Sequence, residues 1–230
     1  MYTQTKLLEN LPKIKTREEI INSIIENKLI VIVRGVKREA LVNTAKALYA
    51  GGVRVMEITF DATGKIGESE TSEMIAELVR ELPDDMIIGS GTVIDESKVN
   101  ATRNGGGAFI ISPDTNPDVI KLTRKLGMVS IPGALTPSEA CIAHNNGADF
   151  VKLFPVGALG ADYVKAVKAP LSHIKMLAVG GFKLSEIDAY KAAGVCGFGV
   201  GTALINKDYI NAGEFDKIEA LTREYVNAIK

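Results

Sequence analysis

The sequence predicts a (β/α)8 barrel, or TIM barrel, with an extra N-terminal helix. Eight short apolar runs alternate along the 230 residues with longer segments of helical period. The runs are apolar on both faces, as strands of a parallel sheet covered by helices must be. Eight strand–helix units in a chain of this length favour a closed barrel, with residues 1–230 forming a single domain. A doubly wound open sheet is the alternative.

The predicted elements follow in chain order. The motif Thr16-Arg-Glu-Glu precedes the first apolar run and predicts the extra helix, placed across the barrel bottom. Thr136 followed by Pro137 is typical of a helix start. The predicted strands are Leu29–Arg34, Val53–Phe60, Met86–Gly91, Ala108–Ser112, Met128–Pro132, Asp149–Phe154, Lys175–Val179 and Cys196–Val200. Helical spacing is recognised in Ala40–Tyr49, Ser97–Asn104, Pro117–Leu126, Thr136–Asn145 and Ser185–Ala193.

Composition and charge narrow the class of protein. The chain is 46% hydrophobic and 24% charged, and its formal net charge of -1 favours neither a nucleic-acid nor a membrane partner. No apolar run reaches the roughly 18 residues of a membrane span. The first 19 residues are too polar for a signal peptide, so a cytoplasmic protein is expected. The two cysteines lack metal-type spacing, and no metal site is predicted.

Lys152 is the sharpest candidate for chemistry, because active sites of this fold lie at the carboxyl ends of the strands. It lies within the otherwise apolar segment Asp149-Phe-Val-Lys-Leu-Phe-Pro. Burial disfavours an ammonium ion and lowers the lysine pKa. A neutral amine can attack a ketone and form a Schiff base. The alternative is a lysine whose charged end reaches out to solvent from the strand end.

Glu57 is the expected companion of Lys152. It lies among apolar residues in Val53-Arg-Val-Met-Glu-Ile-Thr-Phe. A carboxylate inside a barrel needs a nearby cation or proton donor, and Lys152 is the candidate cation. A carboxyl group with a raised pKa can transfer protons near neutral pH. A buried structural ion pair is the alternative.

Candidate substrate-binding groups also follow the predicted strands. Arg34 ends the first strand, where a guanidinium can bind a carboxylate or phosphate through two hydrogen bonds, although a solvated strand-end arginine is equally compatible. The last two strands lead into Val179-Gly-Gly and Gly199-Val-Gly-Thr-Ala-Leu, where backbone N–H groups can approach a phosphate. Tight turns alone would also explain these glycines. Thr92 and Pro113 follow the third and fourth strands as a possible hydrogen-bond donor and an apolar wall.

Several motifs together resemble the 2-keto-3-deoxy-6-phosphogluconate (KDPG) aldolases, the group that includes 4-hydroxy-2-oxoglutarate (KHG) aldolase. The resemblance runs from about Leu29 to the C-terminus. The matching motifs are Val33-Arg-Gly, Gly51-Gly-Val-Arg-Val-Met-Glu-Ile-Thr-Phe, Ile88-Gly-Ser-Gly-Thr-Val, Ile111-Ser-Pro, Ile131-Pro-Gly, Val151-Lys-Leu-Phe-Pro, Val179-Gly-Gly and Gly199-Val-Gly-Thr-Ala-Leu.

The resemblance implies a class I (Schiff-base) aldolase that needs no cofactor or metal and forms a homotrimer. Lys152 would form the Schiff base, and Glu57 would be the general acid/base acting through a water molecule. The pyruvyl pocket would be lined by Thr92, Pro113 and Phe154. The substrate phosphate would bind at Gly180, Gly181 and Gly201, with Thr202 beside them. The small-molecule substrate would be a 2-keto acid, KDPG or KHG or a relative such as the 6-phosphogalactonate analogue.

One departure from the family pattern concerns the substrate carboxylate. Many members carry an arginine shortly after the catalytic glutamate, but here that segment begins Phe60-Asp61-Ala62. Arg34 is the expected substitute, and the loop from Asp61 to Thr71 is expected to be long and polar. Two rival functions remain: a phosphosugar isomerase or epimerase on the same barrel, and a non-catalytic protein that binds keto acids or sugar phosphates.

Overall fold

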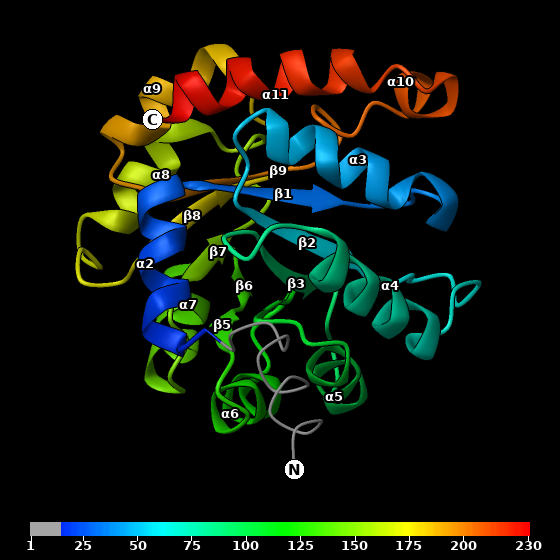
Figure 1. Cartoon of the computed structure of the whole chain (residues 1–230). Coiled ribbons are helices and arrows are strands. Elements are labelled where there is room, and N and C mark those ends of the chain that lie inside the picture. Colours follow the sequence, from blue (N-terminus) through cyan, green and yellow to red (C-terminus); the bar gives the residue numbers. More distant parts are fainter. Residues whose placement is uncertain (1–14) are drawn as a thin grey trace.

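A nearly closed barrel of parallel strands forms the centre of the computed structural model, which describes residues 15–230 (Figure 1). The strand order is β5-β4-β3-β2-β1-β9-β8-β7-β6. β5 (Val129–Ile131) and β6 (Gly133–Ala134) are two halves of one barrel strand, divided at Pro132. β5 pairs with β4 and β6 pairs with β7, so the chain through Pro132 joins the two edges. The predicted barrel is confirmed, and the open doubly wound sheet is excluded.

Each of the eight predicted strands is present, shortened by one to three residues at its ends. The remaining strands are β1 (Leu29–Val33), β2 (Val55–Thr59), β3 (Ile87–Gly91), β4 (Phe109–Ile111), β7 (Val151–Leu153), β8 (Met176–Val179) and β9 (Gly197–Val200). The helices are α2 (Arg17–Asn27), α3 (Arg38–Ala50), α4 (Glu68–Glu81), α5 (Glu96–Asn104), α6 (Pro117–Lys125), α7 (Pro137–Asn145), α8 (Gly160–Lys168), α9 (Ile187–Ala192), α10 (Lys207–Ala212) and α11 (Phe215–Ile229). A short 3-10 turn, η1 (Leu184–Glu186), precedes α9.

Local capping explains where several helices begin. Thr16 and Glu19 form a reciprocal capping box at the start of α2, and Thr136 and Glu139 form another at α7. These bonds satisfy backbone N–H groups that have no partner within the first turn. α2 contacts β2, β5 and β9, and its Ile20 is buried among residues of the barrel interior. The extra helix therefore closes the barrel bottom as predicted.

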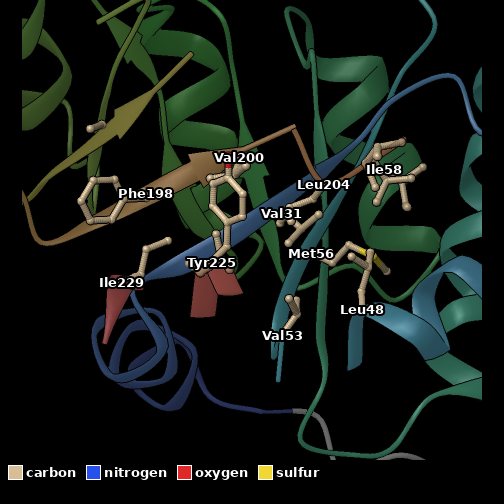
Figure 2. Close-up of a cluster of buried hydrophobic side chains, with 14 of the residues drawn as sticks. Val31, Leu48, Val53, Met56, Ile58, Phe198, Val200, Leu204, Tyr225 and Ile229 are labelled. Atoms are coloured by element: carbon tan, nitrogen blue, oxygen red, sulfur yellow. The ribbon is translucent and has the colours of Figure 1, made fainter. Parts of the chain in front are cut away.

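The strands alternate between two apolar environments. The interior cluster contains Ile30, Val55 and Phe109, whereas the neighbouring residues along each strand face the helices. Figure 2 shows part of the outer layer, in which Val31 of β1 and Met56 of β2 lie with side chains from α3 and α11. A polar side chain on the inner face of these strands therefore lies inside the barrel.

The loop after β2 is shorter than predicted. α4 begins at Glu68, so the connection from β2 ends at Gly67 instead of extending to Thr71. Asp61 organises this loop by accepting hydrogen bonds from the backbone N–H groups of Thr63, Lys65 and Ile66. These bonds lower the pKa of Asp61 to about 2. The extra polar residues of the segment are thus divided between a compact turn and the first turn of a helix.

Two sequence predictions concern membranes and metals. Within residues 15–230, no helix is long and apolar enough to cross a membrane. The same part of the chain holds no group of three or more His, Cys, Asp or Glu residues placed to bind a metal ion. The signal-peptide argument rests largely on residues 1–14, which lie outside the described residues.

Candidate active site

Lys152 and Glu57 are brought together inside the barrel by the two-residue period of the strands. Val151 and Leu153 belong to the outer hydrophobic layer, so Lys152 between them points inward from β7. Met56 and Ile58 place Glu57 inward from β2 in the same way. Lys152 is 7% exposed and Glu57 is 1% exposed. The sequence prediction of two buried, oppositely charged groups therefore holds in the structure.

Burial changes the protonation of both groups. Loss of solvation raises the pKa of Glu57 to about 7, although the positive charges of Lys152 and Arg34 act against this rise. Burial also lowers the pKa of Lys152, and Arg34 lowers it further, while Glu57 opposes the change. A carboxyl group that exchanges its proton near neutral pH therefore lies beside an amine that loses its proton more readily than an ordinary lysine.

The Glu57 carboxylate fits only because glycine occupies position 91. A Cβ atom at Gly91 would overlap the Glu57 side chain. Within residues 15–230, Glu57 Oε2 is a buried oxygen with no hydrogen-bond partner. Unpartnered buried oxygens are rare in folded proteins and call for an explanation. This oxygen is an acceptor available to a substrate hydroxyl or to a water molecule.

A cavity of about 590 Å³ lies at the carboxyl ends of the strands and contains the amine. Its lining includes nine of the ten predicted site residues, namely Arg34, Thr92, Pro113, Lys152, Phe154, Gly180, Gly181, Gly201 and Thr202. Glu57 is the exception, because it is buried below the cavity beside Gly91. This is the end of the barrel at which enzymes of this fold carry their active sites.

Arg34 and Thr92 form a polar pair on one side of the cavity. Arg34 Nη2 donates a hydrogen bond of 3.2 Å to Thr92 Oγ1. Thr92 has a backbone φ of 61°, a left-handed conformation that is unfavourable for a β-branched residue. Strain of this kind tends to occur at functional sites. Asp61, in contrast, is held in its own loop and does not line the cavity.

Glycines open the opposite side of the cavity. A Cβ atom at Gly180 would lie 2.9 Å from the Phe154 ring, and one at Gly157 would overlap the backbone of Gly181. In the described part of the chain, the backbone N–H groups of Gly181 and Thr202 donate no hydrogen bond. Free N–H groups of this kind in glycine-rich loops are suited to bind an anion.

Phe154 and Pro113 supply apolar surface around the amine. Lys152 Nζ lies 4.7 Å from the centre of the Phe154 ring. Pro113 also lines the cavity, and its backbone packs so closely against Gly133 that a Cβ atom at position 133 would overlap it. An apolar wall beside a reactive amine excludes water from a bound keto acid.

Sequence reasoning missed Lys207, which also lines the cavity. No strand or glycine motif marks this residue, because it begins α10 beyond the last glycine loop. Its position depends on the path of the Gly201–Asn206 segment. The only available signal was a cation five residues after Thr202.

A second, larger cavity of about 720 Å³ lies near the amino ends of β3, β4 and β5. Lys15, Arg17 and Arg103 contribute to its lining. Neither Glu57 nor Lys152 lines this larger cavity. Active sites in this fold also lie at the other end of the barrel. We therefore place the candidate active site in the smaller cavity.

The fold and the site together define a class of protein. It is a (β/α)8 barrel with an inward-facing amine suited to capture a carbonyl group and a buried carboxyl group whose pKa lies near neutral. Comparison with known proteins identifies the family. Residues 20–221 match the family model described as KDPG and KHG aldolase. The chain belongs to this family and is therefore an aldolase, an enzyme that acts on carbon–carbon bonds.

Individual relatives support the same assignment. The chain is 34% identical to a probable 2-dehydro-3-deoxy-6-phosphogalactonate aldolase of Rhizobium meliloti, over 82% of this chain and 86% of that protein. It is 32% identical to the KHG/KDPG aldolase of Escherichia coli K12, over 84% and 88%. The Legionella pneumophila KDPG aldolase, solved with pyruvate as a covalent carbinolamine, is 25% identical with a TM-score of 0.78, covering 88% of this chain and 96% of that one.

Proposed function

We propose that this protein is a class I aldolase in which Lys152 forms a Schiff base with a 2-keto acid and releases pyruvate. The observation that carries the proposal is a buried lysine that lines a cavity and interacts electrostatically with a buried carboxyl group, the pKa of the lysine being lowered and that of the carboxyl group raised. The covalent pyruvate adduct reported for the Legionella relative supports the same chemistry here.

The reaction follows from the two groups. The neutral Lys152 amine attacks the C2 ketone, and loss of water gives a protonated imine. Glu57 accepts the C4 hydroxyl proton through a water molecule, and the electrons of the C3–C4 bond move toward the imine nitrogen. The aldehyde departs and leaves an enamine on Lys152. Protonation at C3 and hydrolysis of the imine then release pyruvate and restore the amine.

Two kinds of substrate fit the proposal. KDPG would give pyruvate and glyceraldehyde 3-phosphate, as in the Entner–Doudoroff route of carbohydrate metabolism, and KHG would give pyruvate and glyoxylate. The 6-phosphogalactonate analogue is the alternative, supported by the Rhizobium relative. In each case Arg34 and Thr92 would bind the 2-keto carboxylate, and Pro113 and Phe154 would enclose the pyruvyl group. Gly180, Gly181, Gly201 and Thr202 would bind the distal phosphate of the phosphorylated substrates.

A phosphosugar isomerase or epimerase is disfavoured by Lys152. Such an enzyme needs a pair of acid/base groups and a phosphate site, but it has no need for an amine inside the barrel. A protein that only binds keto acids would need the charge of Lys152 but no acid/base carboxyl group beneath it.

Borohydride trapping tests the proposal. Pyruvate with borohydride should inactivate the enzyme and place one covalent label on Lys152, as read by peptide mapping. Lys152→Met should abolish labelling, and Lys175→Met, at the opposite end of the barrel, should not. A label on another lysine would overturn the assignment of Lys152. Because the mechanism uses neither metal nor cofactor, activity should survive dialysis against EDTA.

The proposal extends to a cytoplasmic homotrimer. Support for assembly comes from exposed apolar residues at the carboxyl-end rim, Ile94 (48% exposed), Leu135 (37%) and Leu159 (44%). Hydrogen bonds from Asn116 to Ile94 and from Tyr163 to Leu135 join these loops to the neighbouring helices. Exposed apolar side chains on loops at one end of the barrel are candidates for an interface if they form a continuous patch. We refer to Ile94, Leu135 and Leu159 as the rim patch.

A further inference from the structure

We propose that Lys207 determines specificity for phosphorylated 2-keto acids by binding the phosphate at the outer end of the cavity. This inference rests on the proposed aldolase function. It assigns a side-chain cation to a subsite that the glycine loops would otherwise form from backbone N–H groups alone.

The path of the chain after β9 carries Lys207 back over the end of β1. Gly201 packs beside Ile32 of β1. A Cβ atom built on Gly201 would lie 3.4 Å from the Ile32 side chain. The segment then turns into α10, whose first residue is Lys207. Lys207 Nζ lies 3.2 Å from the position that a Cβ would occupy on Gly35. The ammonium group is therefore next to Gly35, and Lys207 lines both this cavity and a neighbouring one of about 390 Å³ that Gly35 also lines.

The charge of Lys207 has no protein partner. Among residues 15–230, Lys207 forms no salt bridge and donates no side-chain hydrogen bond, whereas Lys98, Lys191 and Lys217 each pair with a carboxylate. The adjacent Asn206 does not line the cavity, and its side-chain oxygen caps α10 by accepting from the backbone N–H groups of Asp208 and Tyr209. A free ammonium group is thus held at a cavity that contains other anion-binding groups.

Two cations divide the cavity between the two ends of a substrate. Arg34 bonds to Thr92 and influences the charges of Glu57 and Lys152, so it belongs to the inner, pyruvyl end. Lys207 begins α10 shortly after the Gly201–Thr202 loop, lines the same cavity as that loop and lies beside Gly35. A phosphate carries more charge than a carboxylate and gains more from a point charge such as an ammonium. A linear substrate with a carboxylate and a distal phosphate matches this order.

The test compares two substrates that differ only in the phosphate, KDPG and unphosphorylated 2-keto-3-deoxygluconate. In Lys207→Gln, the ratio of kcat/KM for KDPG to that for the unphosphorylated acid should fall about tenfold, the size typical of one lost charged hydrogen bond. Inorganic phosphate should also become a weaker competitive inhibitor. Lys207→Arg should recover most of the ratio. Lys37→Gln removes an exposed lysine that does not line the cavity and should leave the ratio unchanged.

Both substrates are measured on one preparation, so a loss of folded enzyme cancels in the ratio. An unchanged ratio in Lys207→Gln, with borohydride still labelling Lys152, would overturn the role of Lys207 and leave the aldolase function intact. No labelling of Lys152 in the wild-type protein would instead overturn the proposed function. An equal fall of the ratio in Lys37→Gln would show a general effect of surface charge and would also overturn the assignment.

Discussion

At the scale of single residues, the site depends on how burial changes Glu57 and Lys152. A carboxyl group with a pKa of about 7 is protonated in mildly acidic solution and ionised in mildly basic solution. The cleavage direction needs the ionised form, because Glu57 must accept a proton. Cleavage rates should therefore fall as the pH decreases through about 7. The apparent pKa will belong to the coupled Glu57–Lys152 pair.

Glu57→Gln tests this assignment directly. The amide keeps the size of the side chain but cannot accept the proton, so kcat for cleavage should fall by about 10²–10⁴-fold. The part of the acidic limb that reports Glu57 should disappear with it, while the fall caused by protonation of Lys152 and slow trapping of pyruvate on Lys152 remain. Steady-state kinetics from pH 5 to 9 measure both effects. If the variant keeps wild-type turnover, Glu57 is only a structural counter-ion and not the acid/base group.

Arg34 is the second residue with a specific expectation. It lines the cavity and bonds to Thr92, but it is exposed, so water screens its charge. Arg34→Ala should raise KM for 2-keto acids about tenfold. This factor corresponds to the lower end of the free energy that a hydrogen bond to a charged group contributes. Arg34→Lys should recover only part, because an ammonium cannot bind a carboxylate through two parallel bonds.

Comparison of substrates identifies the group that Arg34 binds. KDPG and 2-keto-3-deoxygluconate should lose affinity equally in Arg34→Ala, because both carry the carboxylate. If only KDPG is affected, Arg34 belongs to the phosphate subsite and the carboxylate assignment is wrong.

At the scale of secondary-structure elements, one buried carboxylate fastens α2 to the barrel bottom. Asp149, before β7, is almost fully buried and accepts hydrogen bonds from Arg17 of α2, from Arg124 of α6 and from the backbone of Ser130. Asp149→Ala removes the acceptor that Arg17, Arg124 and the Ser130 N–H share, and should lower the free energy of unfolding by about 1–3 kcal/mol because both arginines remain partly solvated. Urea denaturation measures the loss, and kcat/KM should change little because the cavity lies at the opposite end.

An exposed ion pair provides the control for Asp149. Arg80→Ala breaks the solvent-exposed contact between Arg80 and Glu81 and should leave the urea midpoint almost unchanged. Equal losses in the two variants would show that burial of Asp149 has no special importance for α2.

Element positions were more predictable from the sequence than their precise ends. Apolar runs and helical spacing depend on local sequence, so the eight strands and the bottom helix could be recognised. The division of the fifth strand at Pro132 could not be predicted in this way. Proline lacks the N–H group that would continue the ladder, but whether pairing resumes after it depends on the neighbouring strands. The start of α4 was missed because Glu68 and Glu70 suggest a polar loop, although acidic residues also favour a helix N-terminus.

The site was predictable to the extent that it follows strand ends. Lys152 and Glu57 needed only a strand period and a barrel to be placed face to face. Three other features depend on tertiary packing. They are the left-handed conformation of Thr92, the space that Gly91 leaves for Glu57 and the position of Lys207 at the cavity. No local pattern encodes these features, so they required the structure.

At the scale of the whole molecule, the rim patch makes assembly testable. Leu135 follows β6 directly and is exposed, while its backbone oxygen accepts a hydrogen bond from Tyr163 of α8. Leu135→Glu places a charge in the proposed interface, where burial of an unpaired carboxylate is strongly unfavourable. Light scattering after gel filtration should give three times the chain mass for the wild type and a monomer for the variant.

A matched control separates assembly from general surface effects. Ile25 is similarly exposed, at 36%, but lies on α2 at the barrel bottom, away from the rim patch. Ile25→Glu should remain trimeric because it leaves the rim patch intact. A wild-type monomer would contradict the homotrimer. If Leu135→Glu remains trimeric while Ile25→Glu dissociates, the interface lies at the barrel bottom and the rim patch must have another role.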